Sequence, residues 1–144
     1  MPYCTRQTVE EKYGTTNVQT WASIDNEDPA DTDVQEAISG RIERAITWAT
    51  ERIDARFRKS SYVVPLEAKA GHELTDIADI AAQFARVWLQ ESRAQDRVAD
   101  DDDPSSELRR IRKDAENRIT RYVLGRESLP AVRETAGPRG PFVV

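Results

Sequence analysis

The sequence contains only one cysteine, one histidine and one methionine. A lone thiol, Cys4, cannot form a disulfide within the chain and has no second thiol with which to hold a metal ion. The only histidine is His72, and a catalytic role for it would need a carboxylate and a nucleophile at set positions, which no motif specifies. These scarcities exclude an internally disulfide-bonded fold and a cysteine–histidine zinc site, and they favour a structural role for His72.

Long apolar runs and nucleotide-binding loops are also missing. No stretch approaches the ~18 apolar residues that a membrane-spanning helix needs, and the N-terminus lacks the basic and then apolar segments of a signal peptide. The chain has no glycine-rich phosphate loop and no nucleophile-elbow pattern. We therefore expect a soluble, cytoplasmic protein that is not an enzyme, needs no cofactor and does not contact a membrane.

The residues that are present favour one helical domain. A chain of 144 residues, 38% apolar and 33% charged, can build a single core if the apolar positions share one side of each helix. The net charge of -5 is unevenly spread. Residues 25–36 and 96–103 are strongly acidic, whereas residues 107–126 are mainly basic.

Apolar residues at steps of three and four predict three main helices, at about 33–58, 74–93 and 104–124. The second of these is apolar around most of its circumference, which is typical of a helix at the centre of a domain or in a subunit contact. The shared spacing places seven large side chains inside the fold: Ile46, Ile53, Ile77, Phe84, Trp88, Ile111 and Ile119.

Capping residues predict where the elements begin and end. A short helix runs from Thr5 to Gly14, and a brief turn at 15–22 follows it. Thr32 or Asp33 suits the N-cap of the first main helix, and Gly125 suits the end of the third.

Glycine and proline mark two further features. Gly40 inside the first main helix costs about 1 kcal/mol relative to alanine, so we expect a packing reason for it. Pro65 has no amide hydrogen with which to continue a helix, so residues 60–66 are expected to form a linker.

The expected fold is therefore all-α, with a helical domain over residues 1–130 and an extended tail over residues 131–144. The domain holds the three main helices and one or two short N-terminal helices. Glycines and prolines in the tail oppose helix formation, while Phe142, Val143 and Val144 give it an apolar end. We expect the tail to be mobile in the isolated subunit and to become ordered against a partner.

Two charged segments are candidate binding surfaces. The basic one consists of Arg109, Arg110, Arg112 and Lys113. Clustered arginines can bind phosphates, but Ile111 among them is a predicted core position, which favours a solvated helix face or a protein contact. The acidic one consists of Asp100, Asp101, Asp102 and Asp103. It lacks the ligand spacing and turn glycine of a calcium loop, which favours a solvated loop.

The order of these elements resembles the phage neck adaptors of the Mu-like prophage type, also called head completion or head–tail connector proteins. Four segments carry the resemblance, and together they span most of residues 3–130. They are YCTRQTVEEKYG, AITWATERIDARFRKSSYVVPL, LTDIADIAAQFARVWL and RKDAENRITRYVLGRESLP.

The resemblance implies a helical subunit without an active site that forms a ring under the portal protein. The ring would support the next neck or tail-terminator protein and let DNA pass, and it would be built in the host cytoplasm and reside in the neck of the virion. We expect the acidic segment 96–103 of one copy to meet the basic segment 107–121 of the next.

Two other classes of function stay open. A small helical nucleic-acid-binding subunit of phage DNA packaging would bind DNA through the basic segment, with strong salt dependence. A metal-dependent enzyme would order the four aspartates around a cation.

Overall fold

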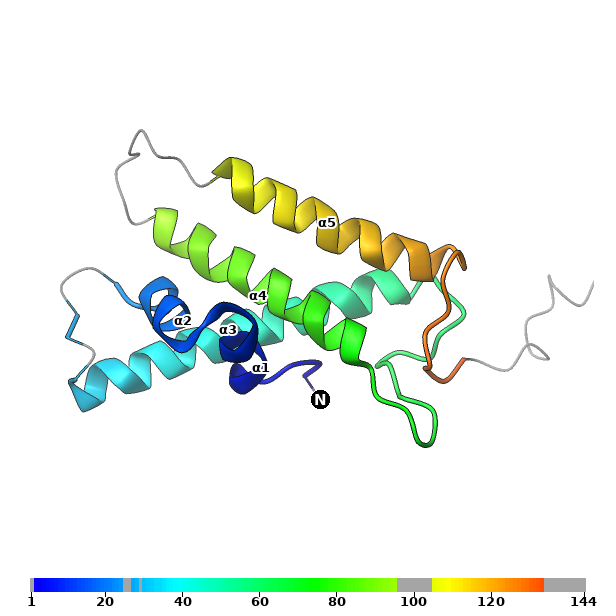
Figure 1. Cartoon of the computed structure of the whole chain (residues 1–144), viewed down its shortest axis with the longest axis horizontal. Helices are drawn as coiled ribbons and strands as arrows, with labels where there is room; N and C mark the ends of the chain where they lie inside the picture. The colour runs from blue at the N-terminus through cyan, green and yellow to red at the C-terminus, as the bar shows by residue number, and fades with distance from the viewer. Residues whose placement is uncertain (1, 25–26, 29, 96–104, 134–144) are drawn as a thin grey trace, which may run out of the picture.

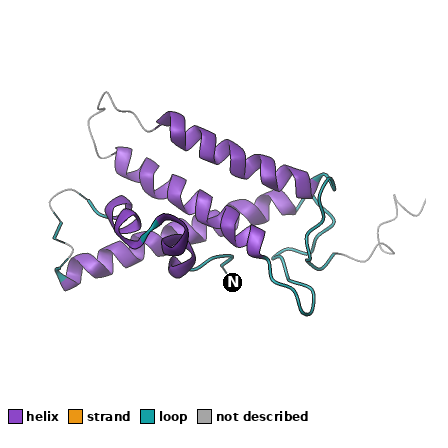
Figure 2. Ribbon diagram, viewed as in Figure 1, coloured by secondary structure: helices purple, strands orange, loops and turns teal. Residues whose placement is uncertain are grey.

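The computed structural model describes residues 2–24, 27–28, 30–95 and 105–133, and it confirms the all-α fold (Figure 1). The described residues form five helices: α1 (Arg6–Tyr13), α2 (Thr15–Ala22), α3 (Thr32–Phe57), α4 (Thr75–Gln95) and α5 (Ser105–Val123). Within these residues there is no strand (Figure 2). The ends of the three predicted main helices agree with those of α3, α4 and α5 to within two residues.

The long helix α3 packs against the other four helices, because its apolar residues share one stripe. All seven of its buried residues follow steps of three and four: Ile38, Ile42, Ala45, Ile46, Ala49, Ile53 and Phe57. The helix begins one residue earlier than expected. Asp31 is its N-cap, since the Asp31 carboxylate accepts a hydrogen bond from the Asp33 amide at 2.9 Å.

Helix α4 lies at the centre of the domain and contacts α1, α2, α3 and α5, as its nearly continuous apolar surface predicts. Ile77, Ile80 and Phe84 have no exposed surface. Of the seven predicted core residues, five are buried, but the placement of Trp88 and Ile111 was wrong, because both are only half-buried. Trp88 lies at the rim of a hollow, and Ile111 lies at the edge of the buried stripe of α5.

The two short N-terminal helices pack against α3 and α4. Thr5 caps α1 with a reciprocal capping box, and Gly14, at φ +92°, separates α1 from α2 as the sequence predicts. The segment before α1 is also held. The Tyr3 hydroxyl donates to the Asp54 carboxylate and accepts the Leu66 amide hydrogen at 2.8 Å.

The expected linker at 60–66 is more than a connection, because it pairs with residues 129–133. The Val63 amide donates to the Val132 carbonyl at 3.0 Å, and the Val132 amide donates to the Glu67 carbonyl at 2.7 Å. Ala131 is fully buried. Residues 131–133, which the sequence placed in the tail, therefore pack on the domain in an extended conformation. Residues 134–144 lie outside the described part of the chain.

The expected packing reason for Gly40 is contradicted. A Cβ atom added at Gly40 would meet nothing within 4 Å. The helix therefore carries a glycine whose side-chain position is open space within the subunit.

Candidate functional site

Helix α5 carries the predicted basic segment and docks on both α3 and α4. Its buried stripe consists of Leu108, Ala115, Ile119 and Tyr122. With so few apolar residues, the orientation of α5 depends strongly on the charged side chains beside the stripe.

The acidic side chains of α5 turn toward the other helices. Glu116 accepts hydrogen bonds from both Arg52 and Arg56 of α3, with the Arg52 Nε at 2.8 Å. Glu107 pairs with Arg86 of α4 at 3.3 Å. These pairs hold Glu107 and Glu116 on the inner side of α5, whereas exposed bases lie on its outer side.

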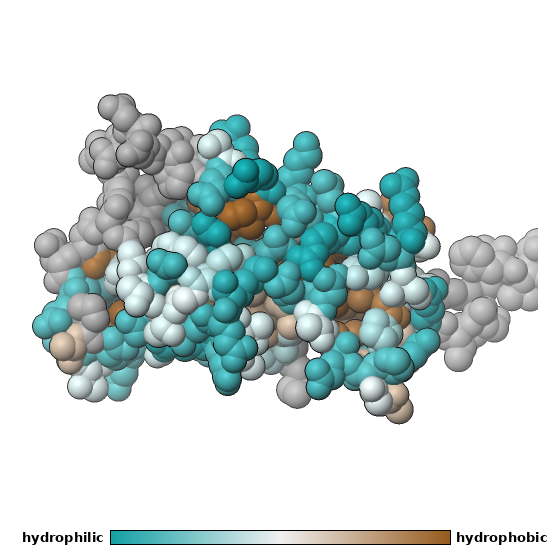
Figure 3. Space-filling view, in the orientation of Figure 1, coloured by the Kyte–Doolittle hydropathy of each residue, from teal (hydrophilic) through white to brown (hydrophobic). Residues whose placement is uncertain are grey.

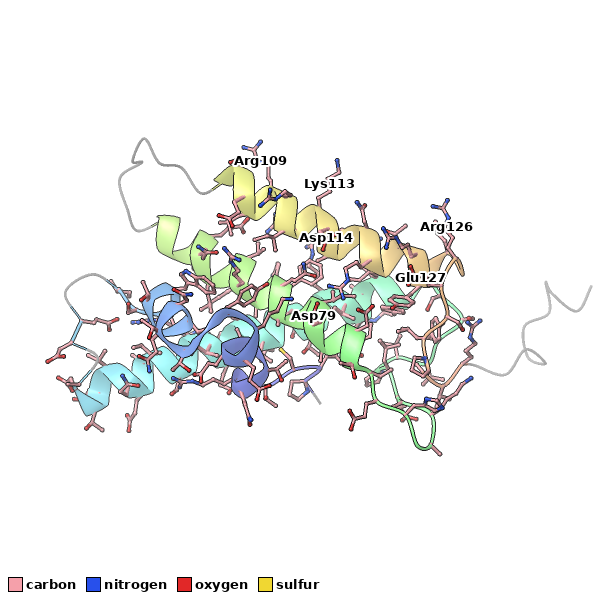
Figure 4. All side chains as sticks on the ribbon, in the orientation of Figure 1. Asp79, Arg109, Lys113, Asp114, Arg126 and Glu127 are labelled. Atoms are coloured by element: carbon pink, nitrogen blue, oxygen red, sulfur yellow. The ribbon has the colours of Figure 1, made fainter. Side chains whose placement is uncertain are left out.

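Arg109, Arg110 and Lys113 form that outer side, which we call the α5 basic face. All three are exposed, and none has a hydrogen bond or ion pair to another described residue. Figure 4 shows Arg109 and Lys113 pointing away from the other helices. Within the described part of the chain, no acid pairs with this cationic surface.

Arg112 does not belong to this face, although the sequence analysis grouped it there. Its guanidinium pairs with Glu91 of α4 at 2.8 Å, and its Nε atom is buried without a hydrogen-bond partner among the described residues. Arg112 follows Leu108 by four residues and therefore lies beside the buried stripe. That spacing is the signal that separates it from its three basic neighbours.

A network around Arg118 was not predicted from the sequence. The Arg118 guanidinium donates to the Asp79 carboxylate at 2.8 Å, to the Gln83 carbonyl oxygen at 2.7 Å and to Asp76. Lys12 of α1 also reaches Asp79, at 2.7 Å. Burial raises the pKa of Asp79, but the hydrogen bonds and charges of Lys12 and Arg118 outweigh burial and lower that pKa overall.

Asp79 and Gln83, two polar residues of α4, therefore face other helices rather than water. Arg86 follows the same rule, because its guanidinium lies over the rings of Tyr13 and Trp21, 4.9 and 4.8 Å from their centroids. Asp79 and Gln83 could be recognised from their helical spacing, but their partners on α1 and α5 are distant in the sequence.

An open hollow of about 180 Å³ lies where α2, α3 and α4 meet. We call it the tryptophan hollow, since Trp21 and Trp88, both half-buried, line it. The other lining residues are Ala22, Ser23, Ile24, Arg41, Arg44, Leu89 and Ser92. The predicted core position of Trp88 gave no indication of this depression.

The remaining candidates contribute no site to the described part of the chain. Asp100, Asp101, Asp102 and Asp103 lie outside it, as do Phe142, Val143 and Val144. Among described residues, no group of three or more histidine, cysteine, aspartate or glutamate side chains could hold a metal ion. His72 is exposed, whereas Cys4 is buried, and burial raises the pKa of its thiol to about 12.

None of the described helices combines the length and the apolar character that crossing a bilayer requires.

Two of the three comparisons with known proteins are negative, since no curated protein and no solved structure matches the chain. The third comparison gives a match that covers more than half of the chain. The family model described as bacteriophage Mu Gp36 matches residues 3–114, from the segment before α1 to the middle of α5. The chain therefore belongs to the bacteriophage Mu Gp36 family.

Proposed function

We propose that this chain is a phage neck adaptor, which forms a ring under the portal protein, connects it to the tail and lets DNA pass. Family membership supports a phage structural or morphogenesis protein, and the neck position is our extension of it. On this proposal the protein catalyses no reaction. Its partners are the portal, neighbouring copies and the next neck or tail-terminator protein, and it resides in the virion.

The observation that carries the proposal is the α5 basic face. Arg109, Arg110 and Lys113 lie on a helix that its acids hold against α3 and α4, so the side on which they project is set before any partner arrives. Exposed ion pairs contribute only about 0–1 kcal/mol each, so this face sets the register and rate of association while apolar contacts supply most affinity. An acidic surface on the portal or on an adjacent copy is the complementary partner.

A nucleic-acid-binding subunit of DNA packaging is the second candidate, because the same three bases have no partner among the described residues. Phosphate binding has a distinct signature. The logarithm of the affinity would fall with the logarithm of salt concentration by about 0.9 for each phosphate contacted, or about 3 for three bases.

The test is a binding measurement between the chain and purified portal of the same phage, by sedimentation. The test variant is Arg109→Glu/Arg110→Glu/Lys113→Glu, which spares Arg112 because Arg112 holds α5 on α4. The control variant is Arg58→Glu/Lys59→Glu/Lys69→Glu, which makes the same charge change at three exposed positions that do not belong to the α5 basic face. Circular dichroism should show both variants folded.

We expect the test variant to bind portal at least about tenfold more weakly, and the control to stay within about twofold of the unchanged chain. Equal binding by all three proteins would show that the α5 basic face does not contribute to portal binding. Absence of portal binding by the unchanged chain, together with steep salt-dependent binding to duplex DNA, would replace the neck adaptor with the packaging subunit.

A further inference from the structure

Two large apolar side chains stand out on the surface of the described residues. Ile24 is 45% exposed and Leu124 is 60% exposed. Ile24 follows α2 and Leu124 follows α5, and the last turns of these two helices lie toward opposite ends of the domain (Figure 1). On the face drawn in Figure 3, apolar residues gather in separate patches among hydrophilic side chains.

Leu124 is held in its exposed position by the way α5 ends. Gly125, at φ +76°, adopts the left-handed conformation. Its amide donates to the Tyr122 carbonyl at 3.1 Å, and the Arg126 amide donates to the Arg121 carbonyl at 2.8 Å. This is the Schellman arrangement, which closes a helix with a defined geometry. The exposure of Leu124 is therefore a fixed feature of the fold.

The position of Ile24 is also fixed, through hydrogen bonds that Arg41 makes with the residues on either side of it. The Arg41 guanidinium donates to the Ala22 carbonyl at 2.8 Å and to the Glu27 carboxylate at 2.7 and 3.2 Å. Glu27 in turn accepts the Ile24 amide hydrogen at 2.6 Å. The segment that presents Ile24 is thus tied to α3 on both sides.

Ile24 also forms one wall of the tryptophan hollow, whose other apolar walls are Trp21, Trp88 and Leu89. A cavity of about 150 Å³ with apolar walls can hold a group as large as benzene. The hollow, at about 180 Å³, is large enough for a leucine side chain.

The charges around the two ends are complementary. Arg121 and Arg126, both exposed, flank Leu124. Four exposed acids lie just beyond Ile24 in the chain: Asp28, Asp31, Asp33 and Glu36. The hollow has one exposed base at its rim, Arg44, and the turn that carries Leu124 holds an exposed acid, Glu127, which pairs with Arg121 of the same turn at 3.6 Å. Arg126 therefore gives this turn its unpaired positive charge among the described residues.

We infer that the turn 121–127 of one copy docks into the tryptophan hollow of the next copy, with Leu124 inserted between Trp21 and Trp88. This inference rests on the proposed function, because it supplies the contact between copies in the ring. The contact joins two different surfaces, so its repetition closes a ring when the rotation between copies fits. The α5 basic face stays outside the contact and remains available to the portal.

A contact centred on one leucine is small compared with stable interfaces, which bury about 1,200–2,000 Å². It is therefore weak in free solution and forms when copies are held side by side at high effective concentration on the portal. The experiment must read the contact both on the portal and at high protein concentration without it.

The experiment is disulfide trapping with two substitutions, Ile24→Cys and Leu124→Cys, made singly and together. Cys4 is left in place, because its thiol is buried and its raised pKa keeps it protonated and unreactive. Under mild oxidation, the double variant should give a ladder of covalent multimers on a non-reducing gel. A mixture of the two single variants should stop at dimers, and either single variant alone should stay monomeric.

Dimers formed by either single variant alone would show a two-fold contact and overturn the inference. Absence of cross-linking on the portal and at high concentration would overturn it as well. If rings form on the portal without this cross-link, the contact is wrong and the proposed function stands. If the cross-link forms in solution but the chain does not bind portal, the contact stands and the proposed function fails.

A charge placed at the contact gives an independent measurement. Leu124→Glu should reduce the number of copies bound per portal at least about tenfold at a fixed concentration, because it puts an acid against the tryptophan rings and the acidic end. Ala55→Glu, at an exposed position in the last turn of α3, is the matched control and should bind normally. Normal assembly by Leu124→Glu would contradict the docking.

Discussion

The two helix contacts on either side of α4 are built from different chemistry. Between α3 and α4 the contact is apolar, with buried isoleucines, alanines and Phe84, whose ring meets that of Trp48 edge to face at 6.0 Å. Between α4 and α5 the contact combines a narrow apolar stripe with charged pairs, chiefly those of Arg118 and Arg112. The contact between α3 and α4 should therefore tolerate changes of charge and pH. The contact between α4 and α5 should be weakened by them.

This difference bears on function through α5. Burial of apolar surface contributes most of the stability, whereas directional ion pairs specify which way a helix faces. The pairs on the inner side of α5 fix the direction of its outer side, where the α5 basic face lies.

Phe84→Ala should lower the free energy of unfolding by about 3–5 kcal/mol, because it opens a cavity between α3 and α4 in the centre of the core. Urea denaturation followed by circular dichroism measures the change. Leu124→Ala, which truncates an exposed side chain, serves as control and should change stability by no more than about 0.5 kcal/mol. A loss below about 1 kcal/mol for Phe84→Ala would show that the apolar contact is not the main source of stability.

Arg118→Met should cost about 2 kcal/mol, since it removes hydrogen bonds to two carboxylates and leaves Asp76 and Asp79 without their guanidinium partner. Amide hydrogen exchange should quicken in α5 more than in α3, because the network lies on the α5 side of α4. Arg110→Met, which removes an exposed base with no partner among described residues, is the matched control. Equal exchange in α3 and α5 would contradict the separate roles of the two contacts.

Acid should weaken the α5 side first. The pKa of Asp79 is lowered in the folded protein, so its contribution is fully present above its unfolded value of about 3.9 and is lost as pH falls through the folded pKa. Between about pH 5 and 3, Asp79→Asn should lose less stability per pH unit than the unchanged chain. Parallel pH profiles for the two proteins would argue against this assignment.

Gly40→Ala should stabilise the subunit by up to about 1 kcal/mol, because the added methyl group meets open space and alanine favours the helix. The gain should appear as a higher midpoint of thermal unfolding. A lower midpoint would reveal a constraint on Gly40 within the subunit that the distances do not show.

The sequence predicted the apolar contact between α3 and α4 much better than the charged contact between α4 and α5. Steps of three and four locate α3 and the buried side of α4, since periodicity reports which side of a helix is apolar. Periodicity does not report which helix lies opposite. The partners of Asp79 and Arg118 are brought together by the fold across a long stretch of chain, and nothing local in the sequence specifies them.

The candidate site was predicted in part for the same reason. Arg109, Arg110 and Lys113 are exposed as expected, while Arg112 turns inward beside Leu108, a distinction that the four-residue spacing contains. The packing of residues 131–133 on the 62–68 segment depends on pairing between distant parts of the chain, which local composition cannot indicate. The tryptophan hollow arises where three helices meet, so no single segment encodes it.

The most direct test of the neck adaptor is electron microscopy of purified portal rings mixed with an excess of the unchanged chain. The account predicts a second ring of density on one face of the portal, coaxial with its channel and open at the centre for DNA. Portal particles that look the same with and without the chain, at concentrations where the chain is folded, would contradict it.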